Sequence, residues 1–75
     1  MRENEVGGFV ECYSGSVYAE HPTAFYWQGI HLQVQEVIRR WREPGKMFFL
    51  VRTAGDELFE LTYDEQADLW LIACQ

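Results

Sequence analysis

The chain has 75 residues, with 12 Asp or Glu against 6 Lys or Arg, which gives a formal net charge of −6 at pH 7. A chain of this length supports one domain, because it has too little interior to divide between two hydrophobic cores. The acidic balance argues against general electrostatic attraction to nucleic acid or to anionic lipid, since both attractions depend on positive charge.

The first part of the chain predicts a flexible lead-in followed by one β domain. Residues 1–7 are mostly polar and end at a pair of glycines, so we expect a lead-in there and a single domain over residues 8–75. The first strand is expected at Phe9–Tyr13, where Ser14–Ser16 bounds it. The stretch Val17–Pro22 is expected to be a loop or an irregular edge.

A second strand is expected over Thr23–Gln28. Phe25 and Trp27 share one face of this strand, so Tyr26 between them points outward. Gln28 and the following glycine form a tight turn into the next strand. These residues predict a β-hairpin.

The stretch from Ile30 to Arg42 has two interpretations. Apolar and polar residues alternate at first, as in a strand. Four apolar residues then follow helical spacing: Val34, Val37, Ile38 and Trp41. A helix of two turns fits that spacing but would be too short to be stable by itself, whereas one extra residue near Gln35–Glu36 would shift the phase of a strand as a β-bulge does. We favour one long, bulged strand.

The remainder of the chain reads as three more strands. Glu43–Lys46 contains Pro-Gly and predicts a type II turn. Strands are expected over Met47–Thr53, Glu57–Tyr63 and Leu69–Cys74. Because a short meander most easily protects its edges by closing, we expect an all-β fold, a six-stranded antiparallel meander curled into a small barrel.

Basic residues gather in one short stretch of this acidic chain. Four of the six surround a tryptophan, and together they form the candidate binding site: Arg39, Arg40, Trp41, Arg42 and Lys46. Such a set can bind phosphates or an acidic protein partner, and the indole can stack on a base. The acidic balance of the chain favours a protein partner over nucleic acid.

The alternative is that these charges pair within the sheet. No basic residue follows Arg52, whereas acidic residues do: Asp56, Glu57, Glu60, Asp64, Glu65 and Asp68. Antiparallel neighbours place such side chains opposite one another, and a turn at Ala54–Gly55 would set Arg52 near Glu57. Exposed ion pairs of this kind are common and weak.

Tyr26 is a second candidate binding residue. With Tyr13 and Tyr18 it could present an exposed aromatic surface to a partner, since Tyr and Trp dominate binding hot spots. The alternative is that these tyrosines cover a thin core. An exposed aromatic face or an open strand edge would also allow a structural homodimer.

Residue types able to bind metal or act as nucleophiles are present but scattered: Cys12, His21, His31 and Cys74. Their spacing has none of the paired ligands of a zinc motif, and nothing marks either cysteine as a reactive thiolate. We expect the two cysteines to be small buried side chains in a reducing compartment, and we expect no catalytic residue, metal or cofactor. With no signal peptide and no apolar run of about 18 residues, the sequence predicts a soluble cytoplasmic protein without a membrane partner.

Several segments carry a resemblance to a known family: Glu11–Gly15, Pro22, Phe25–Gly29, Val34–Arg42, Phe59–Leu61 and Asp68–Trp70. The chain resembles a family of small bacterial domains of unknown function. Its members occur alone, and a similar domain is appended to the C-terminus of some Y-family DNA polymerase-like proteins of the mutagenic repair system. The resemblance implies an accessory or binding module connected with DNA repair, and it carries over no catalytic residue.

Overall fold

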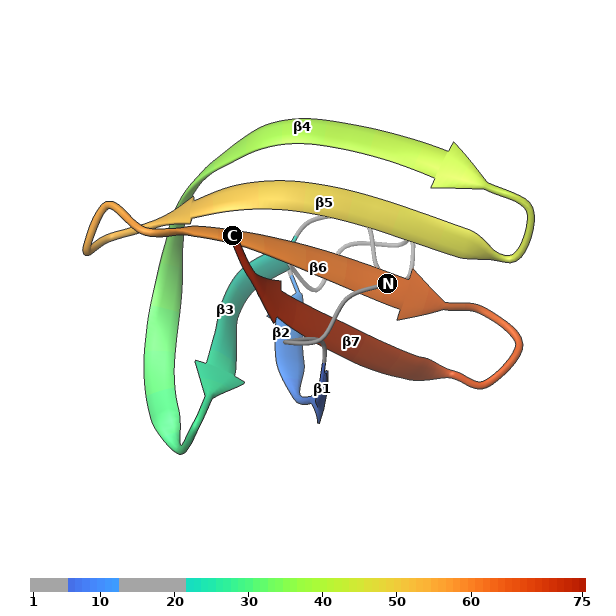
Figure 1. Ribbon diagram of the computed structural model, residues 1–75, viewed down its shortest axis with the longest axis horizontal. Helices are drawn as coiled ribbons and strands as arrows, with labels where there is room; N and C mark the ends of the chain where they lie inside the picture. Colours follow the sequence, from blue (N-terminus) through green and yellow to red (C-terminus); the bar gives the residue numbers. More distant parts are fainter. Residues whose placement is uncertain (1–5, 13–21) are drawn as a thin grey trace.

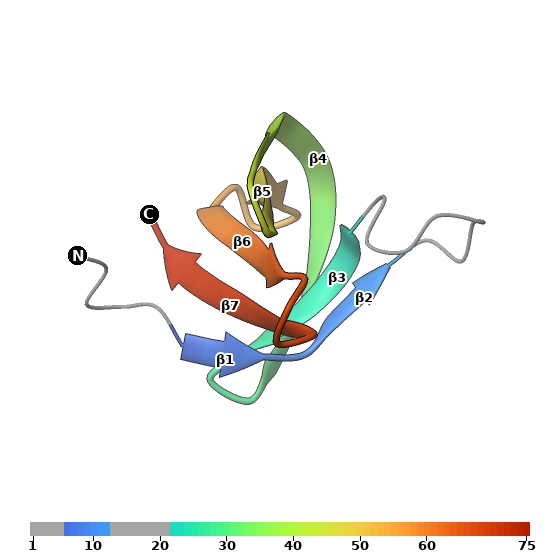
Figure 2. The ribbon, with the colours of Figure 1, turned by 90° about the vertical axis from the view of Figure 1, so that its right-hand side faces the viewer.

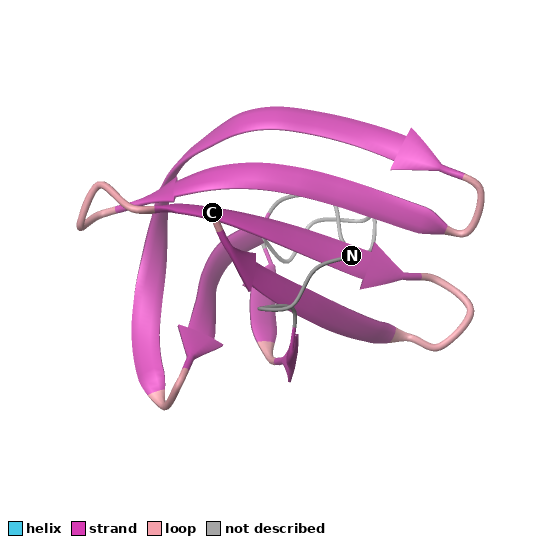
Figure 3. Cartoon of the chain, in the orientation of Figure 1, coloured by secondary structure: helices cyan, strands magenta, loops and turns pink. Residues whose placement is uncertain are grey.

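The computed structural model describes residues 6–12 and 22–75, which form strands joined by turns (Figure 3). The strands are β1 Val6–Gly8, β2 Val10–Cys12, β3 Pro22–Trp27, β4 Ile30–Glu43, β5 Lys46–Thr53, β6 Leu58–Asp64 and β7 Leu69–Cys74. Among these residues, no helix is long and apolar enough to cross a membrane.

All neighbouring strands are antiparallel, and their order is β1-β7-β6-β5-β4-β3-β2 (Figure 1). β1 and β2 follow each other in the chain but occupy the two ends of this order. The segment that contains them therefore bridges β7 and β3 and nearly closes the sheet into a barrel, as Figure 2 shows. The prediction of an all-β antiparallel meander curled into a barrel is confirmed.

The described residues form seven strands rather than six, because the first expected strand is split at Phe9. The residues before Phe9 pair with β7, those after it pair with β3, and the Phe9 carbonyl accepts a hydrogen bond from the Tyr26 N–H at 3.1 Å. Pairing with β7 begins at Val6, within the stretch expected to be a lead-in. Gly8 allows the close approach, since a Cβ there would lie 2.5 Å from the Ile72 Cδ1 atom.

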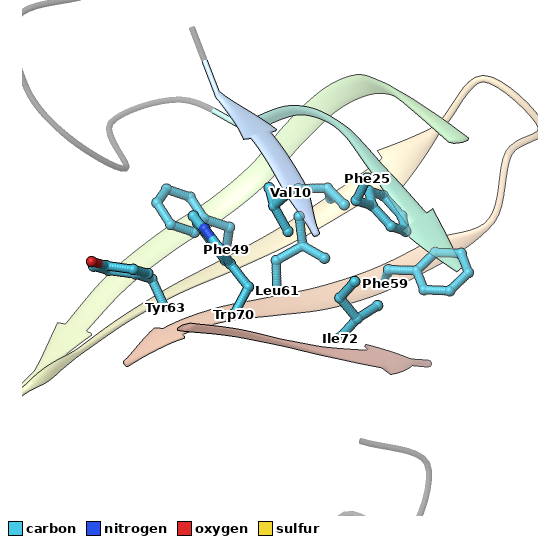
Figure 4. Packing of buried hydrophobic residues seen from close by; sticks show 9 residues of the cluster. Val10, Phe25, Phe49, Phe59, Leu61, Tyr63, Trp70 and Ile72 are labelled. Carbon is cyan, nitrogen blue, oxygen red and sulfur yellow. The ribbon is translucent and has the colours of Figure 1, made fainter. Parts of the chain in front are cut away.

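The core fills the interior of this barrel with large side chains (Figure 4). Its buried members are Val10, Phe25, Phe49, Val51, Phe59, Leu61, Tyr63, Trp70 and Ile72. Phe25 meets Phe59 edge to face, with ring centroids 5.0 Å apart. The shared face expected for Phe25 and Trp27 is the one that meets the core, because Phe25 is buried and Trp27 packs against it. Burial of each large apolar side chain contributes about 1.5–3 kcal/mol to the stability of the folded protein.

β4 is the long strand that the sequence favoured, but it contains two bulges. The pairing with β5 skips one residue between Val34 and Glu36 and another between Val37 and Arg39. Each extra residue shifts the alternation of side chains by one position, so Val34 and Val37 both pack against the core. The helix-like spacing is thus produced by two bulges, and the alternative of a short helix is wrong.

Two tight turns have the backbone geometry that their residues predict. Gln28 and Gly29 both have positive φ, 52° and 80°, as a type I′ hairpin turn requires. Gly45 has a φ of 80° after Pro44, as in a type II turn. These turns fix the register of β3 with β4 and of β4 with β5.

The cysteines differ from each other. Cys12 is half-buried, and burial raises the pKa of its thiol, which favours the neutral form. Cys74 is exposed, contrary to the expectation that both thiols are buried. It lies at the end of β7, beyond the residues that β1 covers.

Candidate functional site

The basic stretch lies on the hairpin of β4 and β5, but the strand divides it between two faces. Arg39 and Trp41 pair with Leu50 and Phe48 on the outer face of the sheet. Arg40 pairs with Phe49, a core residue, so Arg40 and the residue two positions later, Arg42, lie on the inner face, where β4 runs past the core. From the sequence, we expected one cluster of basic residues around Trp41. The structure instead places the arginines of this stretch on opposite faces of the sheet.

The outer face of the hairpin carries an aromatic stack that the sequence analysis did not identify. The rings of Trp41 and Phe48 are nearly parallel, with an interplanar angle of 3° and centroids 5.2 Å apart. The Arg39 Cζ atom lies 5.0 Å from the centroid of the Trp41 ring. A guanidinium so placed over an indole near the surface contributes about 0.5–1 kcal/mol. Phe48 could have been found from the two-residue turn, because pairing Glu43 with Lys46 sets Trp41 opposite Phe48.

Arg42 is neutralised by an acidic side chain from another turn. Its Nη2 atom donates to both oxygens of Glu65, at 2.9 and 2.7 Å. The Glu65 backbone N–H also donates to the Gly45 carbonyl at 2.9 Å, so the β6–β7 turn is attached to the β4–β5 turn. This pair is the cross-sheet neutralisation that the sequence offered as an alternative to partner binding.

Arg52 is also neutralised, but not by the residue expected. It forms ion pairs with Glu36 at 3.2 Å and with Asp56 at 3.5 Å. The expectation that it neighbours Glu57 is wrong, because Arg52 lies opposite Leu58 in the register of β5 with β6. The bulge before Glu36 places this residue opposite Arg52 on β4, the strand that flanks β5 on the side away from β6.

Two basic side chains of the hairpin form no ion pair with the described residues: Arg39 and Lys46. Lys46 lies between Glu43 and Asp64 in the register, so carboxylates near it offset its charge. Arg39 lies opposite Leu50, and its guanidinium is exposed beside the indole. Arg39 is therefore the cation of this hairpin that is best placed for a partner.

Tyr26 belongs to β3 and pairs with His31 near the start of β4. It is therefore not part of the β4–β5 hairpin surface. It is 43% exposed, which confirms that it points outward. Its ring centroid is 5.9 Å from that of Phe9 and 4.9 Å from that of His31. His31 in turn contacts the Glu11 carboxylate at 3.3 Å. Tyr13 and Tyr18 lie outside the described residues.

The described residues contain no group of three or more His, Cys, Asp or Glu side chains that could hold a metal ion. His21, one of the residues considered for such a site, lies outside them. Comparisons with protein-family models, with curated proteins and with solved structures found no match. The family resemblance and the roles it implies therefore stay predictions.

Proposed function

We propose that the protein is a binding module without catalysis, which recognises an acidic segment of a protein partner through the outer face of the β4–β5 hairpin. The observation that supports this is the position of Arg39, exposed over Trp41 and without an ion pair among residues 6–12 and 22–75. A guanidinium of this kind binds a carboxylate through two parallel hydrogen bonds. The half-buried Trp41 supplies apolar surface beside it, and the buried Phe48 supports the indole by stacking on it.

An acidic protein segment fits this surface better than a nucleic-acid backbone does. Binding to phosphates draws on several positive charges at once. Here Arg42 and Arg52 are paired with carboxylates of the same sheet, and the whole chain carries −6. The resemblance to domains of polymerase-like proteins adds a connection with DNA repair to the proposal. A cytoplasmic site of action, which the sequence alone suggested, is also part of the proposal.

The test compares two substitutions that remove the same charge from neighbouring strands. Arg39→Gln removes the exposed guanidinium, and Arg52→Gln removes one that is already paired. Capture of partners from native lysate, with nuclease present, should fall about tenfold for Arg39→Gln, the effect of losing one charge-assisted hydrogen bond. Arg52→Gln should capture as the parent does.

Two controls accompany this comparison: thermal unfolding of each variant, and capture by the parent repeated without nuclease. Thermal unfolding of each variant shows whether the domain remains folded. Equal capture by the parent and Arg39→Gln would reject the proposed site. Capture that disappears with nuclease would identify nucleic acid as the partner instead.

A structural homodimer is the second candidate, and one observation favours it. Phe9 is 61% exposed, and its ring centroid lies 5.9 Å from that of Tyr26, which is 43% exposed. Contiguous exposed apolar side chains commonly mark interaction sites. Light scattering should then show a dimer that Tyr26→Ser dissociates. A monomer at millimolar concentration would exclude this candidate.

A further inference from the structure

The second half of β4 has one paired edge and one edge that the described strands leave open. β3 pairs with β4 only as far as Gln33, and from Val34 to Glu43 the strand pairs with β5. Among residues 6–12 and 22–75, no strand pairs with the other edge of this second half. Figure 1 shows that edge facing away from β5. Such an edge presents backbone N–H and C=O groups that can add a strand.

Part of this edge is protected against strand addition and part is not. The bulges at Gln35 and Ile38 interrupt the ladder there, as is common on sheet edges. From Arg39 to Glu43 the pairing with β5 is regular. A two-residue turn closes with a hydrogen bond between its flanking residues, here Glu43 and Lys46. By the antiparallel alternation, the N–H and C=O of Arg42 then point away from β5.

The side chains along this regular stretch favour an acidic occupant. Arg39 lies on the outer face without an ion pair to the described residues, whereas Arg42 on the inner face is paired with Glu65, so carboxylates on the outer face of an added strand would meet an available arginine. Opposite charges on adjacent strands stabilise their pairing. A second copy of the chain fits poorly, because antiparallel self-pairing centred on Arg39, Arg40 or Trp41 places arginine opposite arginine.

We infer that the acidic partner segment binds in an extended conformation, as an additional strand on the edge of β4 from Arg39 to Glu43. This inference rests on the proposed function and specifies how the partner is held. Backbone hydrogen bonds hold the segment, and alternate side chains select it, as in other complexes formed by strand addition. A carboxylate on the outer face contacts the Arg39 guanidinium, and the side chain two residues away, on the same face, packs beside Trp41.

The test uses a capped, fluorescein-labelled peptide of nine residues in which Glu and Val alternate. Two further peptides carry N-methyl groups, one on every odd residue and one on every even residue. Only one of the two sets faces β4 in an added strand, because N–H groups alternate between the two edges. We expect anisotropy titrations to show one methylated peptide weakened about tenfold or more, and the other bound like the unmethylated peptide.

Protein variants give an independent measurement. Arg42→Gln removes the charge. Arg42→Pro removes both the charge and the backbone N–H that points outward from the open edge of β4. The proline variant should bind the unmethylated peptide more weakly than the glutamine variant. Amide exchange of Arg42 in the parent, which needs no substitution, should slow on addition of the peptide.

Each outcome has a distinct meaning. Equal binding of both methylated peptides, or unchanged exchange at Arg42, would overturn strand addition. If Arg39→Gln still reduced lysate capture, the outer-face site would stand and only the mode of binding would be wrong. No binding of any of the peptides at millimolar concentration would also overturn the inference. Equal lysate capture by the parent and by Arg39→Gln would instead reject the proposed function itself.

Discussion

β4 and β6 lie on opposite sides of β5, and they have opposite surroundings. In β6 the residues 59–63 are all buried, so both faces of the strand are covered. In β4 every residue is exposed or half-buried. The two strands that flank β5 thus differ: β6 holds the barrel together, and β4 presents the exposed Arg39 guanidinium beside the half-buried Trp41 ring.

This difference follows from where β4 runs. It pairs with β3 at its beginning and then curves along β5, where its other edge has no paired strand among the described residues (Figure 1). Among the described strands, the second half of β4 therefore has a neighbour, β5, on one edge only. Substitutions of its side chains there should have less effect on folding. We expect substitutions to affect stability at β6 and binding at β4.

The largest effect is expected for Leu61→Ala in β6. Leu61 is fully buried in the core, and truncation to Ala should lower the free energy of unfolding by about 2–5 kcal/mol through lost burial and the cavity left behind. Leu58→Ala in the same strand is the matched control, because Leu58 is 40% exposed. Urea denaturation of the two variants measures the difference. Similar losses for both would contradict the view that β6 is stabilised by its buried residues.

A smaller effect, of opposite sign, is expected at the outer face of β6. Thr62 is 1% exposed, and its hydroxyl has no hydrogen-bond partner among the described residues. Thr62→Val should stabilise the protein by about 1 kcal/mol, because it removes an unsatisfied buried polar group at nearly constant shape. Thermal unfolding gives the sign of the change.

Thr53 provides the contrast for that measurement. Its hydroxyl accepts a hydrogen bond from the Glu57 N–H at 3.2 Å, so Thr53→Val should destabilise by about 1–2 kcal/mol. If Thr62→Val also destabilised the protein, the outer face of β6 would be hydrated. The contrast with β4 would then be restricted to the inner face.

The strand pattern was predictable from sequence because it depends on local periodicity and turn residues. Alternation identified β3, β6 and β7, and Pro44-Gly45 identified the β4–β5 turn. The split at Phe9 was not predictable, because it depends on pairing with two strands from distant parts of the chain. A single sequence does not contain that long-range register.

The candidate site was predictable in its location but not in its geometry. Basic residues around Trp41 could be read directly, and the alternation of a strand divides them between two faces, but which face each one takes depends on the bulge at Ile38. The pairing of Arg42 with Glu65 depends on the contact between two turns that are far apart in sequence. Only the structure distinguishes Arg39 from the arginines that carboxylates neutralise.

The smallest effect is expected at the tip of the hairpin, where Arg42 and Glu65 join β4 to the β6–β7 turn. Both side chains are partly exposed, so Glu65→Gln should lower stability by less than about 1 kcal/mol at low salt. The difference should disappear at about 1 M salt, where the Debye length is about 3 Å. Unfolding curves at the two salt concentrations measure it.

The same substitution sharpens the comparison of β4 with β6, because it releases the Arg42 guanidinium without changing β4. If the hairpin is a binding surface limited by internal neutralisation, Glu65→Gln should strengthen binding of the alternating Glu-Val peptide, while Glu57→Gln, an equal charge change at the other end of β5, should not. Equal gains for both variants would mean that net charge governs binding. Arg42 would then have no local role.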